Sequence, residues 1–153
     1  DSLSAMSVAE DQAGFAMEVF AARSIGHATL DISDRHKTTS QRLISFSGAE
    51  DTRAKTYDVA QLLAHPDTIV DSATGLFAPT DAVIEMNCAR SEIAAVESSS
   101  NSTSDSAQSR TTAENSSDDS RQQSLGILTS MIADRVDLAL TWGYPSFDEA
   151  LFE

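Results

Sequence analysis

Residues 75–96 read GLFAPTDAVIEMNCARSEIAAV, and this stretch has the most regular apolar spacing in the chain. Pro79 suits a turn or a first helical position, and Thr80 or Asp81 can cap the free backbone N–H groups of a first turn. Apolar side chains then recur at steps of three and four, at Ala82, Met86, Ala89, Ile93 and Val96. Glu85 and Glu92 fall along the flank of this narrow face. The spacing predicts a helix that packs against partner helices in a bundle.

The length and charge of the chain limit its class. Its 153 residues fit a single domain, residues 1–153, that is large enough to bury a core. A net charge of −14 repels nucleic acid and anionic membranes, so any nucleic-acid site must be local. No apolar run approaches the roughly 18 residues of a membrane span, and no signal-peptide pattern opens the chain, so we expect a soluble protein without a membrane partner. Cys88 stands alone, which excludes an internal disulfide and suits a small buried residue.

Two helices are predicted before the opening stretch. Ser7 and Glu10 fit the S-x-x-E capping box, which predicts a helix over residues 8–24 with Glu10 on its solvated side. Residues 28–32 alternate between apolar and polar and fit a short strand or a loop. The pattern over residues 33–46 favours a second helix, with a strand at its end as the alternative.

This second helix would concentrate positive charge. Arg35, Lys37 and Arg42 place three of the ten basic residues of the chain within eight positions. That makes the segment the natural candidate for phosphate contact. The alternative is a solvated face whose cations pair with nearby carboxylates.

The rest of the chain adds helices and one low-complexity tract. Residues 56–64 predict a short helix that Pro66 ends, and residues 68–73 fit either more helix or extended chain. Residues 98–117 are rich in serine and predict an inter-helix loop. A long helix over residues 119–142 has an apolar arc that includes Arg135, which we expect to snorkel or to pair with a carboxylate of another helix. A further capping box, residues 146–149, predicts a short terminal helix.

Catalytic motifs are sparse. His27, Asp31, Asp34 and His36 include metal-ligand types, but their spacing matches no zinc or iron arrangement. The chain has no glycine-rich phosphate loop, no G-x-S-x-G and no C-x-x-C. A small metal-dependent enzyme would require His27, Asp31 and His36 to converge. We therefore expect no enzyme and no cofactor.

Several short segments, taken in order, resemble the coat proteins of rod-shaped plant RNA viruses, the tobacco mosaic virus family. Residues 36–46, HKTTSQRLISF, resemble the basic A-R-T-x-x-Q-R-Q-F stretch of that family. Other matching landmarks are Lys55-Thr56-Tyr57 before Pro66, Gly75-Leu76-Phe77 with Val83-Ile84-Glu85, Asp118-Asp119, and Ser146-Phe147-Asp148. The resemblance lies in the order and approximate spacing of these segments rather than in any single motif.

The resemblance implies a mainly α fold, a four-helix bundle with a small β element at one end. It implies a structural capsid protein that self-assembles into a helical rod around single-stranded RNA, in a virion formed in the host cytoplasm. In that arrangement the serine-rich loop, residues 98–117, would line the central channel. The alternative is a non-viral helical or ring-forming assembly protein that carries no nucleic acid.

The same resemblance implies candidate RNA contacts. Family arginines at the start of the third helix correspond to Thr80 and Ala82, so that contact is lost, or is replaced by Arg90 or by backbone N–H groups at the helix start. The expected RNA-binding residues are Lys37, Arg42, Thr80, Arg90, Asp119 and Arg121. The resemblance also implies carboxylates that repel one another between subunits, here Glu85 and Asp118, so assembly is expected to be favoured at mildly acid pH.

Overall fold

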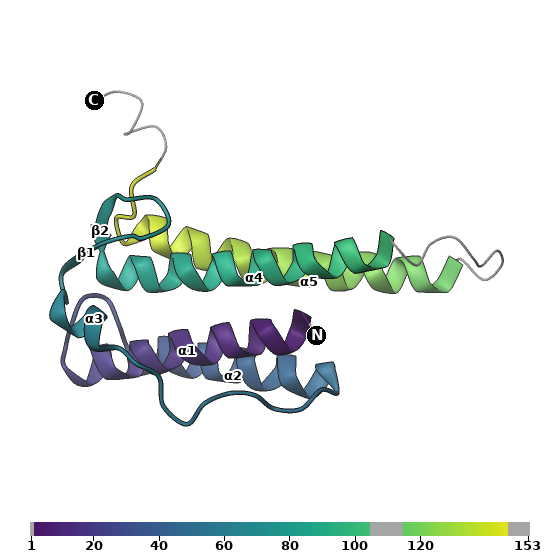
Figure 1. The fold of residues 1–153 in the computed structure, drawn as a ribbon, viewed down its shortest axis with the longest axis horizontal. Coiled ribbons are helices and arrows are strands. Elements are labelled where there is room, and N and C mark those ends of the chain that lie inside the picture. The colour runs from purple at the N-terminus through teal and green to yellow at the C-terminus, as the bar shows by residue number, and fades with distance from the viewer. Residues whose placement is uncertain (1, 105–114, 147–153) are drawn as a thin grey trace.

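The computed structural model describes residues 2–104 and 115–146, and this part of the chain is mainly helical with one small sheet (Figure 1). The elements in order are α1 (Ser2–Ala22), α2 (Leu30–Ser47), α3 (Ala60–Ala64), β1 (Thr68–Val70), β2 (Phe77–Pro79), α4 (Thr80–Ser104) and α5 (Asn115–Thr141). None of the described helices is both long and apolar enough to cross a lipid bilayer.

The four long helices form two layers. One layer holds α1 and α2, and the other holds α4 and α5, with the sheet and α3 at one end (Figure 1). Helix α1 packs against both α2 and α4, and α4 packs against α5. The layers therefore pack most closely through α1 and α4, and α2 and α5 face each other across a more open space.

The starts of α1 and α2 differ from those expected. Helix α1 begins at Ser2, so Ser7 and Glu10 lie inside a helix and the predicted capping box is wrong. Helix α2 is confirmed, but its cap is Thr29, whose side chain accepts a hydrogen bond from the Ile32 backbone N–H at 3.2 Å. A short strand or a loop is expected over residues 28–32, and residues 30–32 of that segment instead form the first turn of α2. Gly48, with φ of 64°, ends the helix in the left-handed conformation.

The segment of chain that connects α2 to α4 contains α3 and the sheet. Strand β1 pairs antiparallel with β2, with Ile69 opposite Ala78, so residues 68–70 take the extended alternative. The expected helix over residues 56–64 forms only as α3. Residues 98–104 and 115–117 are helical, so α4 and α5 extend into the serine-rich tract that we expected to be a loop. The terminal helix expected from residue 146 onward falls outside the described residues.

Two apolar clusters form the interior. The larger lies toward the sheet and includes Phe20, Met17 and Trp142. The smaller lies toward the start of α1 and contains Met6, Leu43 and Ala95. Buried charged side chains occupy the helix positions between these clusters, and they are Glu10, His36, Glu85 and Glu92.

Candidate functional site

Each of the four long helices contributes at least one charged side chain to a buried cluster. His36 of α2 lies at its centre, with Nδ1 2.5 Å from Glu10 Oε2 and Nε2 2.8 Å from Glu85 Oε1. Arg135 of α5 donates from Nε and Nη2 to the two oxygens of Glu10, at 3.0 and 3.1 Å. The His36, Glu10 and Glu85 side chains are fully buried. We call Glu10, His36, Glu85, Cys88, Glu92 and Arg135 the interior cluster.

The pKa values of the central pair shift in opposite directions. Burial alone would lower the pKa of His36, but hydrogen bonds to Glu10 and Glu85 outweigh burial and raise it. Burial alone would raise the pKa of Glu10, but His36 and Arg135 outweigh burial and lower it. Both shifts favour the charged forms, so the centre of the cluster behaves as an ion pair.

Two further members of the cluster favour their neutral forms. Burial raises the pKa of Glu92 to about 9, and the neighbouring Glu10 carboxylate adds to this shift. Burial also raises the pKa of the Cys88 thiol well above its usual value. Neither oxygen of Glu92 has a hydrogen-bond partner in the described part of the chain, and the same is true of Glu85 Oε2. The cluster thus contains buried carboxylate oxygens that have no hydrogen-bond partner among the described residues.

Small residues allow α1 and α2 to approach closely beside this cluster. A Cβ at Gly14 would lie 3.0 Å from His36 Cβ, so a larger residue there would push α2 away. Ser33 donates to the Gly14 carbonyl at 2.7 Å, and Ser7 and Ser40 bond to each other and to each other's carbonyls. These contacts hold His36 at a fixed depth between the helices.

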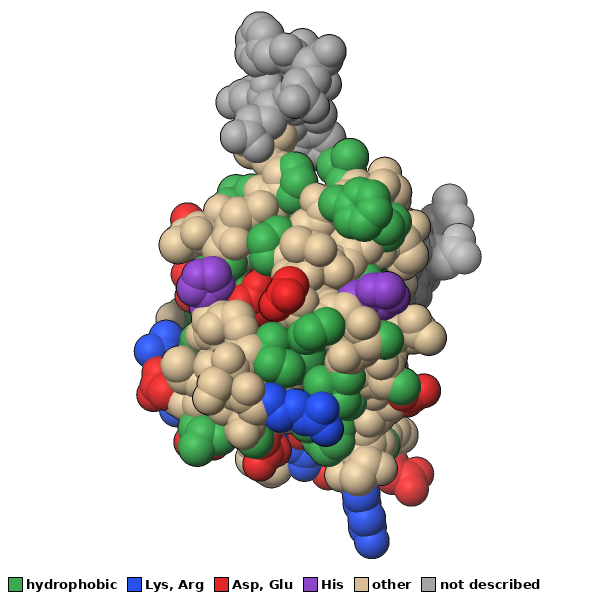
Figure 2. Space-filling view, turned by 90° about the vertical axis from the view of Figure 1, so that its left-hand side faces the viewer, with side chains coloured by type: hydrophobic (Ala, Val, Ile, Leu, Met, Phe, Trp, Pro, Cys, Tyr) green, Lys and Arg blue, Asp and Glu red, His purple; other side chains and the backbone are tan. Residues whose placement is uncertain are grey.

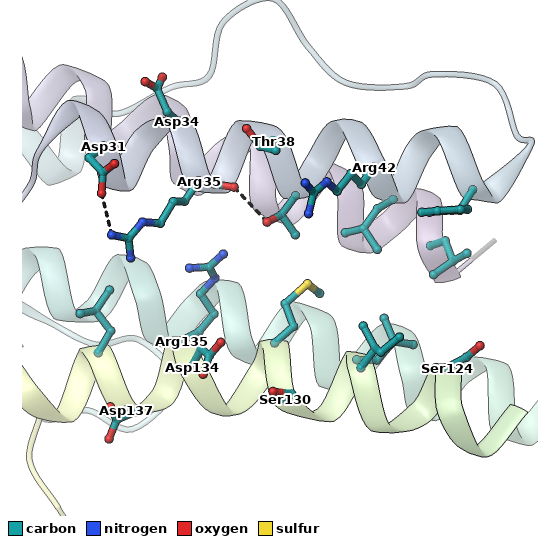
Figure 3. A pocket seen from close by; sticks show the side chains of 18 residues that line it. Asp31, Asp34, Arg35, Thr38, Arg42, Ser124, Ser130, Asp134, Arg135 and Asp137 are labelled. Carbon is teal, nitrogen blue, oxygen red and sulfur yellow. Dashed lines mark hydrogen bonds and ion pairs between the residues drawn. The ribbon is translucent and has the colours of Figure 1, made fainter. Parts of the chain in front are cut away.

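An open groove separates α2 from α5. It encloses about 1260 Å³ and is drawn in Figure 3. We call it the α2–α5 groove. Its apolar lining includes Leu3, Leu43, Phe46, Ile127, Leu128, Met131 and Leu138, and its charged lining is Asp31, Asp34, Arg35, Arg42, Asp134, Arg135 and Asp137. Arg135 belongs to both features, because it lines the groove and binds Glu10 in the interior cluster.

A second apolar surface lies on the sheet. Val70, Leu76 and Phe77 are exposed there, and the Phe77 side chain is the most exposed of the three. Figure 2 shows the end of the molecule that carries the sheet, where apolar side chains gather among polar ones. This sheet-end patch lies at the opposite end of the helices from Leu3 and Phe46 (Figure 1).

Among the expected RNA-binding residues whose side chains the structure describes, Lys37, Arg90 and Thr80 are each bound to other residues of the chain. Lys37 pairs with Glu18 of α1. Arg90 donates to Asp71 at 2.7 Å and to the Tyr144 hydroxyl at 2.7 Å. Thr80 is buried and donates its hydroxyl hydrogen to the His65 carbonyl.

Arg42 is different, because it lines the α2–α5 groove and has no ion-pair partner in the described part of the chain. The side chains of Asp118, Asp119 and Arg121, at the start of α5, fall outside the described residues. Glu85, expected between subunits, is instead buried and bonded to His36, so it is not available at a subunit surface.

The metal-ligand types along residues 27–36 do not converge. His27 bonds Asp81 at 2.9 Å and stacks on Trp142, whereas Asp31 pairs with Arg35 at 2.7 Å on the surface. Only His36 reaches the interior. Sequence reasoning missed the interior cluster because it placed Glu10 on the solvated face of α1.

Comparisons with protein families, curated proteins and solved structures find no match to this chain.

Proposed function

We propose that this chain is a structural subunit that associates with further copies of itself, with the sheet-end patch of one copy seated in the α2–α5 groove of the next. The observation that carries the proposal is the open apolar mouth of the groove. Phe46 is 81% exposed and Ile127 is 64% exposed, although both lie beside further apolar lining residues. Large apolar side chains exposed together in this way mark interaction surfaces.

The choice of a second copy as the partner rests on the presence of two unlike apolar surfaces. The mouth of the groove and the sheet-end patch lie at opposite ends of the helices. A contact between two different surfaces of the same chain is head-to-tail, and it repeats without closing unless the rotation returns to the start. Such a contact builds rings or filaments from a single kind of subunit. In this arrangement a neighbouring copy covers the apolar mouth of the groove that one subunit leaves exposed.

Single-stranded RNA is a second candidate partner, as the resemblance to rod-shaped virus coat proteins implies. Arg42 supports it, because a cation that lines the groove without a carboxylate partner is free to meet a phosphate. Four aspartates line the same groove, and Lys37 and Arg90 are already paired, so the protein-only assembly is the better supported of the two.

Sedimentation and electron microscopy of the purified full chain test the proposal. We expect particles larger than a monomer that grow with protein concentration, and growth with added salt because the net charge of −14 makes the subunits repel one another. Nuclease treatment and the ultraviolet absorbance ratio then separate RNA-filled from empty particles. A chain that stays monomeric at all concentrations and salt levels would overturn self-assembly.

A further inference from the structure

The interior cluster contains the donor set of a metal site. Glu10, His36 and Cys88 come from three different helices, and all three are buried. One ligand atom from each lies within 4.8 Å of the other two. We propose that these three side chains bind one divalent transition-metal ion, with Zn²⁺ as the ion that fits the donors best. This inference is independent of self-assembly.

The donor atoms suit zinc by type and by spacing. Zinc binds imidazole nitrogen, thiolate sulfur and carboxylate oxygen together, whereas Mg²⁺ and Ca²⁺ require mainly oxygen. Bonds of about 2.0–2.3 Å in a tetrahedron place ligand atoms about 3.3–3.8 Å apart. The contact between His36 Nδ1 and Glu10 Oε2, now 2.5 Å, must open by less than about 1 Å to admit the ion between them.

Glu92 provides an independent observation that points to a ligand. Its side chain is fully buried, yet neither of its oxygens has a hydrogen-bond partner among the described residues. Such a group is costly to bury unless something binds it. Glu92 follows Cys88 by one helical turn, so both project from the same face of α4. Glu92 is not among the three residues whose donor atoms lie within 4.8 Å of one another, so its carboxylate must move toward the ion to serve as the fourth ligand of a tetrahedron.

The surrounding contacts match those around protein metal ligands. A ligating histidine uses one ring nitrogen for the metal and the other for a carboxylate that fixes the ring. Here Glu85 Oε1 lies at hydrogen-bond distance, 2.8 Å, from His36 Nε2, and His36 Nδ1 faces Glu10. Arg135 in turn holds both oxygens of Glu10. Glu85 and Arg135 are thus positioning residues rather than ligands.

Binding of the ion displaces protons from the cluster and requires a route to it. Thiolate formation at Cys88 releases one proton, and the pair of His36 and Glu10 releases a second. Glu92, whose raised pKa keeps it protonated at neutral pH, releases a third proton when it ligates as a carboxylate, so one divalent ion replaces three protons and the buried cluster gains one negative charge. Arg135 separates Glu10 from the α2–α5 groove, so a swing of its guanidinium into the groove opens a route for the ion.

Titration of the full chain with Zn²⁺ alone, after treatment with a chelator, tests the site. We expect one ion per chain for the wild type, and loss of that binding in C88S and E10Q. E85Q, which removes only the orienting carboxylate, should weaken binding about 10–100-fold. His65 is exposed and remote from the cluster, so H65Q is the matched control and should bind as the wild type does.

Two spectroscopic measurements on the wild type keep the test decisive even if a variant does not fold. Co²⁺ substitution should give a thiolate-to-metal charge-transfer band. X-ray absorption at the zinc edge should show one sulfur at about 2.3 Å. A shell of nitrogen and oxygen only, or equal Zn²⁺ binding in the wild type and a folded C88S, would overturn the proposal.

Discussion

Arg135 of the last helix binds Glu10 of the first, with its Nε and Nη2 atoms at 3.0 and 3.1 Å from the two carboxylate oxygens. The two residues are 125 positions apart in the chain. Their contact joins the two helical layers at the point where the α2–α5 groove meets the buried cluster. The fold therefore relies on a charge pair where its apolar clusters are interrupted.

Replacing Arg135 with leucine should destabilise the chain strongly. The Glu10 carboxylate would stay buried with only His36 as its charged partner, and breaking one side of a buried pair costs about 3–5 kcal/mol. Urea unfolding at neutral pH measures the loss. R35L is the matched control, because Arg35 pairs with Asp31 on the surface, where such pairs contribute less than about 1 kcal/mol. Equal losses in R135L and R35L would contradict a buried role for Arg135.

The stability of the metal-free chain should fall as pH rises from mildly acid to alkaline values. Folded Glu92 keeps its proton up to a pH of about 9, whereas the unfolded chain releases it near 4.5. Over that range the folded state binds more protons, so the free energy of unfolding falls by up to about 1.4 kcal/mol per pH unit. His36 also lowers the stability as pH rises. Its pKa in the folded chain is raised, and the positive charge that stabilises the folded state is lost when the pH rises through this pKa.

The variant E92Q separates the contribution of Glu92 to the pH dependence of stability from that of His36. The variant should be about 3 kcal/mol more stable than the wild type at pH 7, with a flatter dependence on pH. Denaturant unfolding in the presence of a chelator, from pH 5 to pH 9, measures both. The charged and titratable groups that face Glu92 are Glu10, His36, Glu85, Cys88 and Arg135, and all remain in the variant. A wild type and variant with parallel pH profiles would refute the raised pKa.

The sequence predicts the helices better than it predicts the cluster. The three-and-four spacing of residues 82–96 correctly indicates a packed helix, but Ile93 of the predicted face is exposed, whereas Glu85 and Glu92 on its flank are buried. Arg135 inside an apolar arc leaves two alternatives, snorkelling or a carboxylate partner on another helix, and the structure shows the partner. Glu10 and Glu85 look like flanking, solvated residues because their partners lie 26 and 49 positions away from them, at His36. Local periodicity carries no information about such distant pairing.

The boundaries at the serine-rich tract show a second limit of sequence reasoning. Serine at caps and in loops competes for backbone hydrogen bonds, so residues 98–104 favour a loop by composition. In the structure, Ser98 instead bonds the Ala94 carbonyl within α4. The tract continues a helix that is already formed, and that continuation costs less than starting one.

Asp71 should give the chain an acid-sensitive contact at the sheet. Burial would raise its pKa, but hydrogen bonds from Arg90, Tyr144 and the Ala73 backbone N–H lower it below the usual 3.8. A depressed pKa contributes stability above about pH 4 that is lost as pH falls through the folded value. D71N should lower the free energy of unfolding by about 2–3 kcal/mol at neutral pH. On acidification the variant should then lose less stability than the wild type does.

Unfolding of D71N at pH 7 and at pH 3 checks this expectation. Asp34 is exposed and lines the groove, so D34N is a control with the same change in charge and should match the wild type within about 0.5 kcal/mol. If D71N and the wild type lose the same stability between the two pH values, the titration of Asp71 does not contribute to the acid sensitivity of the fold.

Head-to-tail assembly makes a specific prediction for variants of its two surfaces. F46D places a charge at the mouth of the α2–α5 groove, and F77D places one on the sheet-end patch. A head-to-tail contact needs both surfaces, and every copy of a given variant lacks the same one. Each variant alone should therefore remain monomeric. Both residues are exposed, so folding stability should change by less than about 0.5 kcal/mol. I93D, which changes an exposed residue of α4 outside the groove, should assemble as the wild type does.

Mixing the two variants distinguishes the proposed contact from a symmetric one. In an equal mixture, the intact sheet-end patch of F46D can enter the intact groove of F77D, and the remaining surfaces are both blocked. The mixture should therefore sediment as dimers and should form nothing longer. A symmetric groove-to-groove contact would instead leave F77D able to assemble alone, and mixing would not rescue F46D.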